Sequence, residues 1–179
     1  MSITRSLGRM TSRSSLNSFV DVGSSTCGSS AKSAASGSET TTGSVFGGRR
    51  TDFGVAYDNG FGVAQDYLQA VNWYRKAAEQ GYAAAQTNLG HMYANGQGVT
   101  QDDVQAFSWF SKAAEQGFAE AQYNVGLLYA NGRGVARDSQ QAFSWCRKAA
   151  EQGLADAQSD LGVMYDNGLG VASDNRQAV

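Results

Sequence analysis

The hexapeptide KAAEQG occurs at residues 76–81, 112–117 and 148–153, and each copy starts 36 residues after the one before it. An internal period between about 20 and 50 residues is typical of proteins built from stacked structural repeats. In such proteins each unit buries its apolar side against its neighbours. The period therefore predicts an array of repeats rather than a domain around one central core.

The same interval aligns residue types that are otherwise uncommon. They are Trp73, Trp109 and Trp145, then Gly81, Gly117 and Gly153, and then Tyr93, Tyr129 and Tyr165. Pairs of glycines recur in the same way, at Gly96 and Gly98, Gly132 and Gly134, and Gly168 and Gly170. Agreement over so many positions indicates that one structural unit is copied along the chain.

One unit, taken over residues 66–99, reads as two helices joined by a short turn. Asp66 is the expected N-cap of the first helix, and Gly81 is expected to end it in a left-handed conformation. A second helix is expected from about residue 83 to 94, before the turn sequence ANGQGV. We expect the aligned tryptophans and tyrosines to form the structural core of each repeat, beside small residues that let the helices approach closely.

The repeated pattern A-x-x-W-[YFC]-x-K-A-A-E-Q-G-x-A-x-A-Q-x-x-[LV]-G-x-x-Y-x-N-G-x-G-V is similar to the Sel-one-like repeat (SLR), a relative of the tetratricopeptide repeat. The resemblance covers residues 66–179 and continues upstream in FGVAYDNGFGV at 53–63. It implies an all-α fold, a right-handed α-solenoid of 36-residue helix-turn-helix repeats.

On this basis the chain divides into six segments. Residues 1–48 form a disordered tail rich in Ser, Thr and Gly, and 49–65 form the second helix and turn of a partial first repeat. Complete repeats follow at 66–101, 102–137 and 138–173. Residues 174–179 begin a truncated further repeat, which is expected to leave the C-terminal repeat uncapped and open to end-to-end association.

The start of the tail leaves two interpretations open. Residues 1–19 carry Arg5, Arg9 and Arg13 without an acidic residue, and they place Ile3, Leu7 and Met10 at helical spacing. This composition fits a mitochondrial presequence in outline, but short basic, Ser-rich tails imitate such signals easily. A cytoplasmic location is the main expectation, and a mitochondrial one is the minor alternative.

Composition and motifs exclude most other classes of protein. A net charge of −2 provides no basic footprint for nucleic acid, and no apolar run is long enough to span a membrane. The lone His91 has no partners at metal-ligand spacing and is expected on a variable helix surface. Cys146 aligns with Tyr74 and Phe110, so it is expected to pack in the core. We therefore expect no catalytic residue, no metal, no cofactor and no enzyme.

The resemblance implies a non-enzymatic scaffold or adaptor that holds other proteins, in signalling, complex assembly or protein quality control. First helices line the concave groove of the related superhelices, and a groove of this kind accepts a peptide or a helix. The candidate partner-binding residues are the variable positions of the first helices, Asn72, Ser108 and Ser144 in one row and Arg75, Ser111 and Arg147 in another. The invariant lysines (Lys76, Lys112, Lys148) are placed where they could support glutamates three residues later. For partner binding, the preferred interpretation is that they form a solvated helix surface.

Two alternatives remain at this stage. A secreted, cysteine-rich branch of the resembled family is linked to β-lactam hydrolysis, but its members carry a cysteine pair in each repeat, whereas only one cysteine here lies within a repeat. The other alternative is that the chain is a fragment of a larger multidomain regulator.

Overall fold

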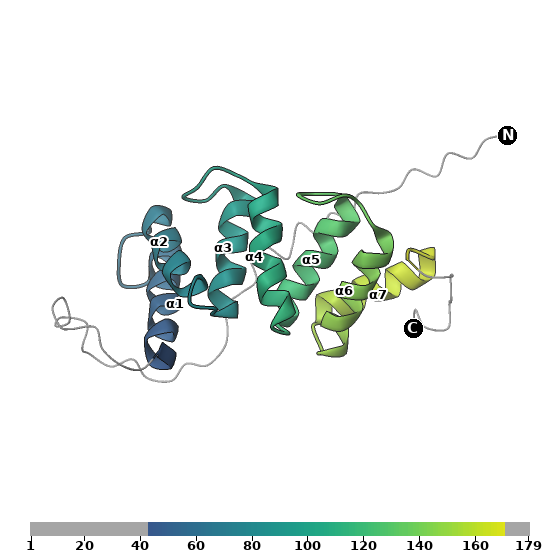
Figure 1. The fold of residues 1–179 in the computed structure, drawn as a ribbon, viewed down its shortest axis with the longest axis horizontal. Helices are drawn as coiled ribbons and strands as arrows, with labels where there is room; N and C mark the ends of the chain where they lie inside the picture. The colour runs from purple at the N-terminus through teal and green to yellow at the C-terminus, as the bar shows by residue number, and fades with distance from the viewer. Residues whose placement is uncertain (1–42, 171–179) are drawn as a thin grey trace. The chain divides into compact units, whose positions relative to one another are not determined.

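The computed structural model describes residues 43–170, and the described chain is all helical, with no strand in that range. This range contains seven helices. They follow one another in chain order, as Figure 1 shows. Their bounds are α1 Gly43–Asn59, α2 Tyr67–Ala78, α3 Ala83–Asn95, α4 Asp103–Glu115, α5 Ala119–Asn131, α6 Ser139–Glu151 and α7 Ala155–Asn167. The helices α2, α4 and α6 are the first helices of the repeats, and α1, α3, α5 and α7 are the second helices. The expected helical repeat solenoid is confirmed.

The first helices all begin in the same way. The side chain of Asp66 accepts a hydrogen bond from the backbone N–H of Gln69, and Asp102 and Asp138 cap α4 and α6 by the same contact. Each carboxylate satisfies a backbone donor that has no partner within the helix, and its charge suits the positive end of the helix dipole. The aspartates therefore set the start of each repeat, as their position in the sequence predicts.

The second helices end at a glycine in the left-handed conformation. Gly96, Gly132 and Gly168 have φ values of 69°, 67° and 64°, in a region that other residues adopt only with strain. The first helices end differently. Gly81 has a φ of 89°, but it lies in the turn after the helix, whose C-cap is Glu79. The glycine of KAAEQG thus belongs to the turn and not to the last helical position.

The boundary at the N-terminal side differs from the prediction. Helix α1 begins at Gly43 rather than at residue 49, so residues 43–48, which the sequence placed in the tail, are helical. The expected disorder of residues 1–42 and the expected further repeat at 174–179 lie outside the described residues.

Each second helix packs closely on the first helix that follows it, through a glycine. A β-carbon added to Gly90 would lie 2.7 Å from the ring of Phe110, and one added to Gly126 would lie 2.6 Å from Cys146 Sγ. Gly54 meets the Tyr74 ring in the same manner. The missing side chain lets a large one from the next helix fill the space, so each repeat depends on its successor.

The core assignment of the tryptophans needs correction. Trp73, Trp109 and Trp145 are only half-buried, whereas the residue after each of them (Tyr74, Phe110 and Cys146) is fully buried. The helix is turned so that the position after tryptophan points at the glycine of the preceding helix. The aligned tyrosines Tyr93, Tyr129 and Tyr165 are also half-buried, and the glycines of KAAEQG are exposed. The fully buried core consists of alanines, the residue after each tryptophan and aliphatic residues of the second helices such as Leu89 and Val125. Trp109, Trp145, Tyr93 and Tyr129 pack against this core from its edge.

Candidate interaction surface

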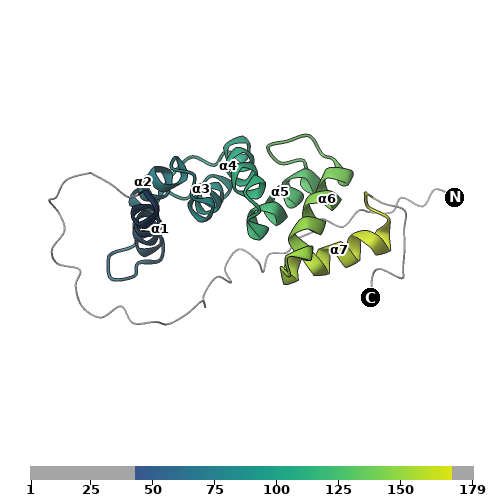
Figure 2. The same ribbon diagram turned by 60° about the horizontal axis from the view of Figure 1, so that its bottom comes forward.

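The candidate binding residues of the first row lie on the solvent-exposed side of the first helices. Asn72 on α2, Ser108 on α4 and Ser144 on α6 are all exposed, so this row is accessible in every complete repeat. Figure 2 shows these three helices in succession, with α3 and α5 between them. Because the three residues occupy equivalent positions of successive units, they face the same side of the array.

The second row is less uniform than the first. Arg75 is half-buried and donates from Nη2 to the hydroxyl of Tyr93 at 3.1 Å, so part of its function is to tie α2 to α3. Ser111 is half-buried. Arg147 is exposed and donates from Nε to Glu151 Oε1 at 2.7 Å. Only Arg147 of this row is therefore presented to solvent as a charged group on the outer surface.

A repeated contact that the sequence analysis missed lies beside these rows. The ammonium groups of Lys76, Lys112 and Lys148 lie over the rings of Trp73, Trp109 and Trp145, at 4.9, 3.9 and 4.0 Å from the ring centres. A cation over an aromatic face is attracted by the negative potential of the ring. The expected lysine–glutamate pairs are therefore replaced by lysine–tryptophan pairs at the same spacing of three residues, which could have been recognised in the repeated WxxK sequence.

Buried glutamines connect one repeat to the next. Gln86 donates to the carbonyl of Ala78 at 3.1 Å and accepts a hydrogen bond of 2.7 Å from Gln116. One repeat later, Gln122 donates to Ala114 at 3.2 Å and accepts from Gln152 at 2.8 Å. A buried amide with both of its ends satisfied fixes the positions of the helices around it. The spacing of the outer rows is therefore set by polar contacts as well as by apolar packing.

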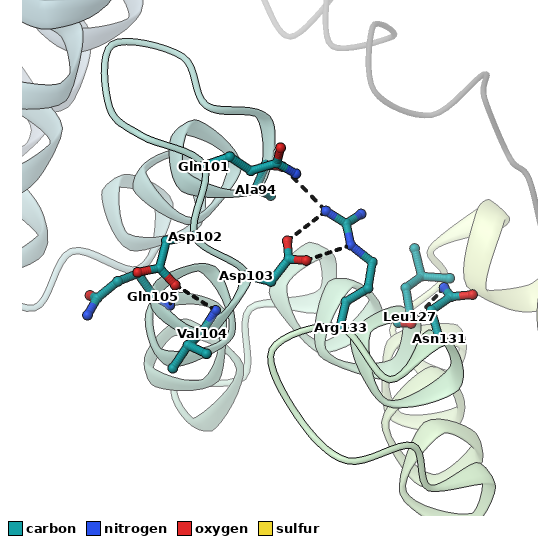
Figure 3. Close-up of polar contacts among 9 residues, drawn as sticks. All are labelled: Ala94, Gln101, Asp102, Asp103, Val104, Gln105, Leu127, Asn131 and Arg133. Atoms are coloured by element: carbon teal, nitrogen blue, oxygen red, sulfur yellow. Dashed lines mark hydrogen bonds and ion pairs between the residues drawn. The ribbon is translucent and has the colours of Figure 1, made fainter.

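Two further contacts occur at single places in the array. Arg133, in the turn after α5, binds Asp103 at the start of α4 and reaches the carbonyl of Ala94, as Figure 3 shows. His91 on α3 lies 3.1 Å from Glu120 on α5, and its ring meets Phe110 edge-on. The expectation that His91 is merely a variable surface residue is therefore wrong, because it joins two repeats.

The described residues contain no cluster of His, Cys, Asp and Glu that could hold a metal ion. Cys146 is buried, and that burial, followed by the negative charge of Asp160, raises the pKa of its thiol to about 12. A thiol with so high a pKa is a poor nucleophile at neutral pH, because the thiolate is the reactive form. None of the helices between residues 43 and 170 is both long and apolar enough to cross a bilayer.

The helix pairs, their glycine contacts and their period agree with a known family model. The model of the Sel1 repeat matches four times, at residues 53–82, 83–118, 119–154 and 155–179. The chain belongs to the Sel1 repeat family. The family model counts each unit from a second helix to the following first helix, whereas we count from the first helix, so the two divisions describe one array in different phases.

Sel1 repeat structures from bacteria resemble this chain. A protective antigen present in uropathogenic Escherichia coli strains, which displays an SLR fold, is 44% identical with a TM-score of 0.72, over 74% of this chain and 30% of that one. A Sel1 repeat protein from Oxalobacter formigenes is 42% identical with a TM-score of 0.70, over 74% of this chain and 54% of that one. The present chain thus spans about a third to a half of these relatives. No curated protein matches it.

A more distant Sel1-type structure shows the fold alone. Cysteine-rich protein B of Helicobacter pylori is 22% identical with a TM-score of 0.51, over 65% of this chain and 97% of that one. The described residues of the present chain contain a single cysteine, Cys146, and it forms no disulfide. Sel1 repeat proteins are in general helical repeat scaffolds that mediate protein interactions.

Proposed function

We propose that this Sel1 repeat chain is a non-enzymatic adaptor that captures other proteins along the outer rows of its first helices. The observation that carries the proposal is the contrast between the two sides of those helices. The buried side repeats nearly the same small residues, whereas the exposed row holds polar residues that pack on nothing in the core, an asparagine at Asn72 and serines at Ser108 and Ser144. Variation on a constant frame is how repeat proteins acquire individual binding surfaces.

The proposed ligand is a peptide or a helix of a partner protein that lies along the row. The amide and hydroxyl side chains of the row both donate and accept hydrogen bonds, and Arg147, which is paired with Glu151, adds a guanidinium donor at one end. Signalling, complex assembly and protein quality control are the settings that fit such an adaptor. We propose the cytoplasm as its compartment, with the mitochondrion as the alternative.

The experiment compares two triple variants in quantitative pull-downs with the full chain as bait. The test variant is Asn72→Arg, Ser108→Arg and Ser144→Arg, which places a large charge along the whole row. The control variant is Ala64→Arg, Thr100→Arg and Ala136→Arg, which adds the same charge at three exposed and equivalent positions of the turns. We expect the test variant to lose specific partners and the control variant to keep them, with equal helicity in circular dichroism. Retention of the same partners by the test variant would exclude the row as the binding surface.

A further inference from the structure

Within residues 43–170, the N-terminal end of the array exposes a face whose equivalents in the inner repeats are covered. Helix α1 is a second helix, and its Phe53 occupies the position that Leu89 holds in α3 and Val125 holds in α5. Leu89 and Val125 are 0% and 1% exposed, whereas Phe53 is 52% exposed. One side of the Phe53 ring contacts Trp73 of α2 at 5.1 Å between ring centres. The other side of the Phe53 ring is exposed, although the equivalent side chains in the inner repeats are buried.

The turn after α1 gives independent evidence for a helix-binding surface. In the inner repeats the matching glycines (Gly98, Gly134 and Gly170) lie against the backbone at the start of the first helix of their own pair, where an added β-carbon would strike a carbonyl oxygen. Gly62 has the same left-handed conformation, with a φ of 72°, yet no atom of the described residues lies within 4 Å of a β-carbon built on it. Gly62 therefore has the backbone conformation and the free space that accommodate the start of a first helix in the inner repeats.

Two apolar side chains lie in the same turn as Gly62. Phe61 and Val63 are 60% and 40% exposed. The counterparts of Val63 in the next two repeats, Val99 and Val135, are packed against the apolar cores. We call Phe53, Phe61, Gly62 and Val63 the α1 face. It combines an uncovered core position with a turn that is shaped for close backbone contact.

The arginines beside the α1 face indicate the direction in which a helix would dock on it. Arg50 occupies the position of Gln86, whose amide donates to the carbonyl of Ala78 in the last turn of α2. A cation at this position favours the C-terminal end of a helix, where unpaired carbonyls carry partial negative charge. Arg49 stands where the other repeats bury an alanine, such as Ala85, so a docked helix has to present acceptors rather than apolar side chains at that end.

We propose that the α1 face binds one amphipathic helix from a second polypeptide. The helix takes the position that α2 holds against α3, with its first turn on Gly62 and its last turn beside Arg50. The three inner copies of this interface define its chemistry, which is an apolar stripe rich in alanine over the first turns and carbonyl or carboxylate groups at the end. This site is separate from the outer rows of the first helices, because it lies at the end of the array.

The test uses the full chain and a labelled peptide with the sequence of residues 66–81, which is a first helix with a free C-terminal carboxylate. Fluorescence anisotropy is expected to show saturable binding. Gly62→Asn is expected to weaken that binding at least about tenfold, because asparagine tolerates the left-handed conformation but fills the space that the docked backbone needs. Gly60→Asn is the control, since Gly60 has a φ of 73° and only ordinary contacts around its β-carbon.

Three results would overturn the proposal. The first is the absence of saturable binding to the full chain, and the second is equal affinity of the wild-type chain and the Gly62→Asn variant. The third is an equal loss of affinity in the Gly62→Asn and Gly60→Asn variants when both keep the wild-type helicity. A peptide with Ala70→Glu and Ala77→Glu tests the apolar stripe, and binding as tight as that of the unmodified peptide would also contradict it. Self-association of the chain through this face that the peptide does not displace would show that a second copy, not a first-type helix, is the occupant.

Discussion

Arg133 binds Asp103 through two hydrogen bonds, from Nε to Oδ2 at 3.0 Å and from Nη2 to Oδ1 at 2.6 Å, between the turn after α5 and the start of α4 (Figure 3). The matching positions in the neighbouring repeats hold Gln97 and Leu169 in place of the arginine. This bidentate contact is therefore specific to one repeat. It holds the turn after α5 against the start of α4.

Removal of this contact is expected to destabilise the array only slightly. The side chains of Arg133 and Asp103 are 46% and 30% exposed, so water screens their attraction. We expect Arg133→Ala to lower the free energy of unfolding by no more than about 1 kcal/mol, and added salt to reduce the difference. Urea unfolding of Arg133→Ala, Asp103→Ala and the double variant measures the coupling. Additive effects of the two single changes would show that the ion pair contributes nothing.

The close approach at Gly126 predicts a larger effect. A β-carbon there would lie 2.6 Å from Cys146 Sγ and 3.2 Å from the carbonyl of Ala142, so Gly126→Ala forces α5 and α6 apart. We expect a loss of about 1–3 kcal/mol in thermal or urea unfolding. Cys146→Ala in the same chain removes the sulfur and is expected to recover part of that loss. Gly48→Ala is the control, because Gly48 is also helical and nothing lies near its β-carbon, so this change is expected to stabilise α1 by up to about 1 kcal/mol.

The lysine–tryptophan stacks predict that Lys112 stabilises the fold through Trp109 and not through Glu115. Lys112→Met keeps the aliphatic stem but removes the charge that lies 3.9 Å from the ring centre. We expect a loss of about 0.5–1 kcal/mol and a change in tryptophan emission. Glu115→Gln is expected to leave both quantities nearly unchanged. A larger loss of stability in Glu115→Gln than in Lys112→Met would show instead that the lysine–glutamate pair is the stabilising contact.

The buried thiol of Cys146 provides a probe of unfolding. Because burial raises its pKa to about 12, the folded chain is expected to resist a thiol reagent at about pH 8, near the ordinary range of a free thiol. The variant Cys27→Ser leaves Cys146 as the single cysteine of the chain. Its labelling rate should rise with urea in parallel with the loss of helicity. Rapid labelling of the fully folded variant would contradict the buried position.

The same pKa sets the sign of a pH effect. The folded pKa of Cys146 lies above its unfolded value, so the stabilisation is complete below the ordinary thiol pKa and is lost as the pH rises toward about 12. Cys146→Ala should therefore flatten the decline of stability in alkaline solution. If the stability of Cys146→Ala falls at high pH as steeply as that of the wild-type chain, other titrating groups cause the decline.

The period and the helix ends could be predicted because they depend on local chemistry. An aspartate caps a helix through the N–H groups two or three residues later, and a glycine ends one through its own φ, so both signals are contained within a few residues. The candidate rows could be located for a similar reason, since their positions follow from the helical period. The start of α1 was missed because residues 43–48 combine glycines with few apolar residues, and propensity alone argues against a helix there.

By itself, the sequence determined that this protein is an array of helix pairs and where most of its helices begin and end. Only the tertiary structure decided that the residue after each tryptophan is buried and that His91 joins two repeats. The physical reason is that burial and pairing depend on how neighbouring helices are rotated and how closely they approach. Those quantities arise from contacts between residues about 20 to 37 positions apart, such as Gly126 with Cys146 and Tyr123 with Asp160, which no local pattern specifies.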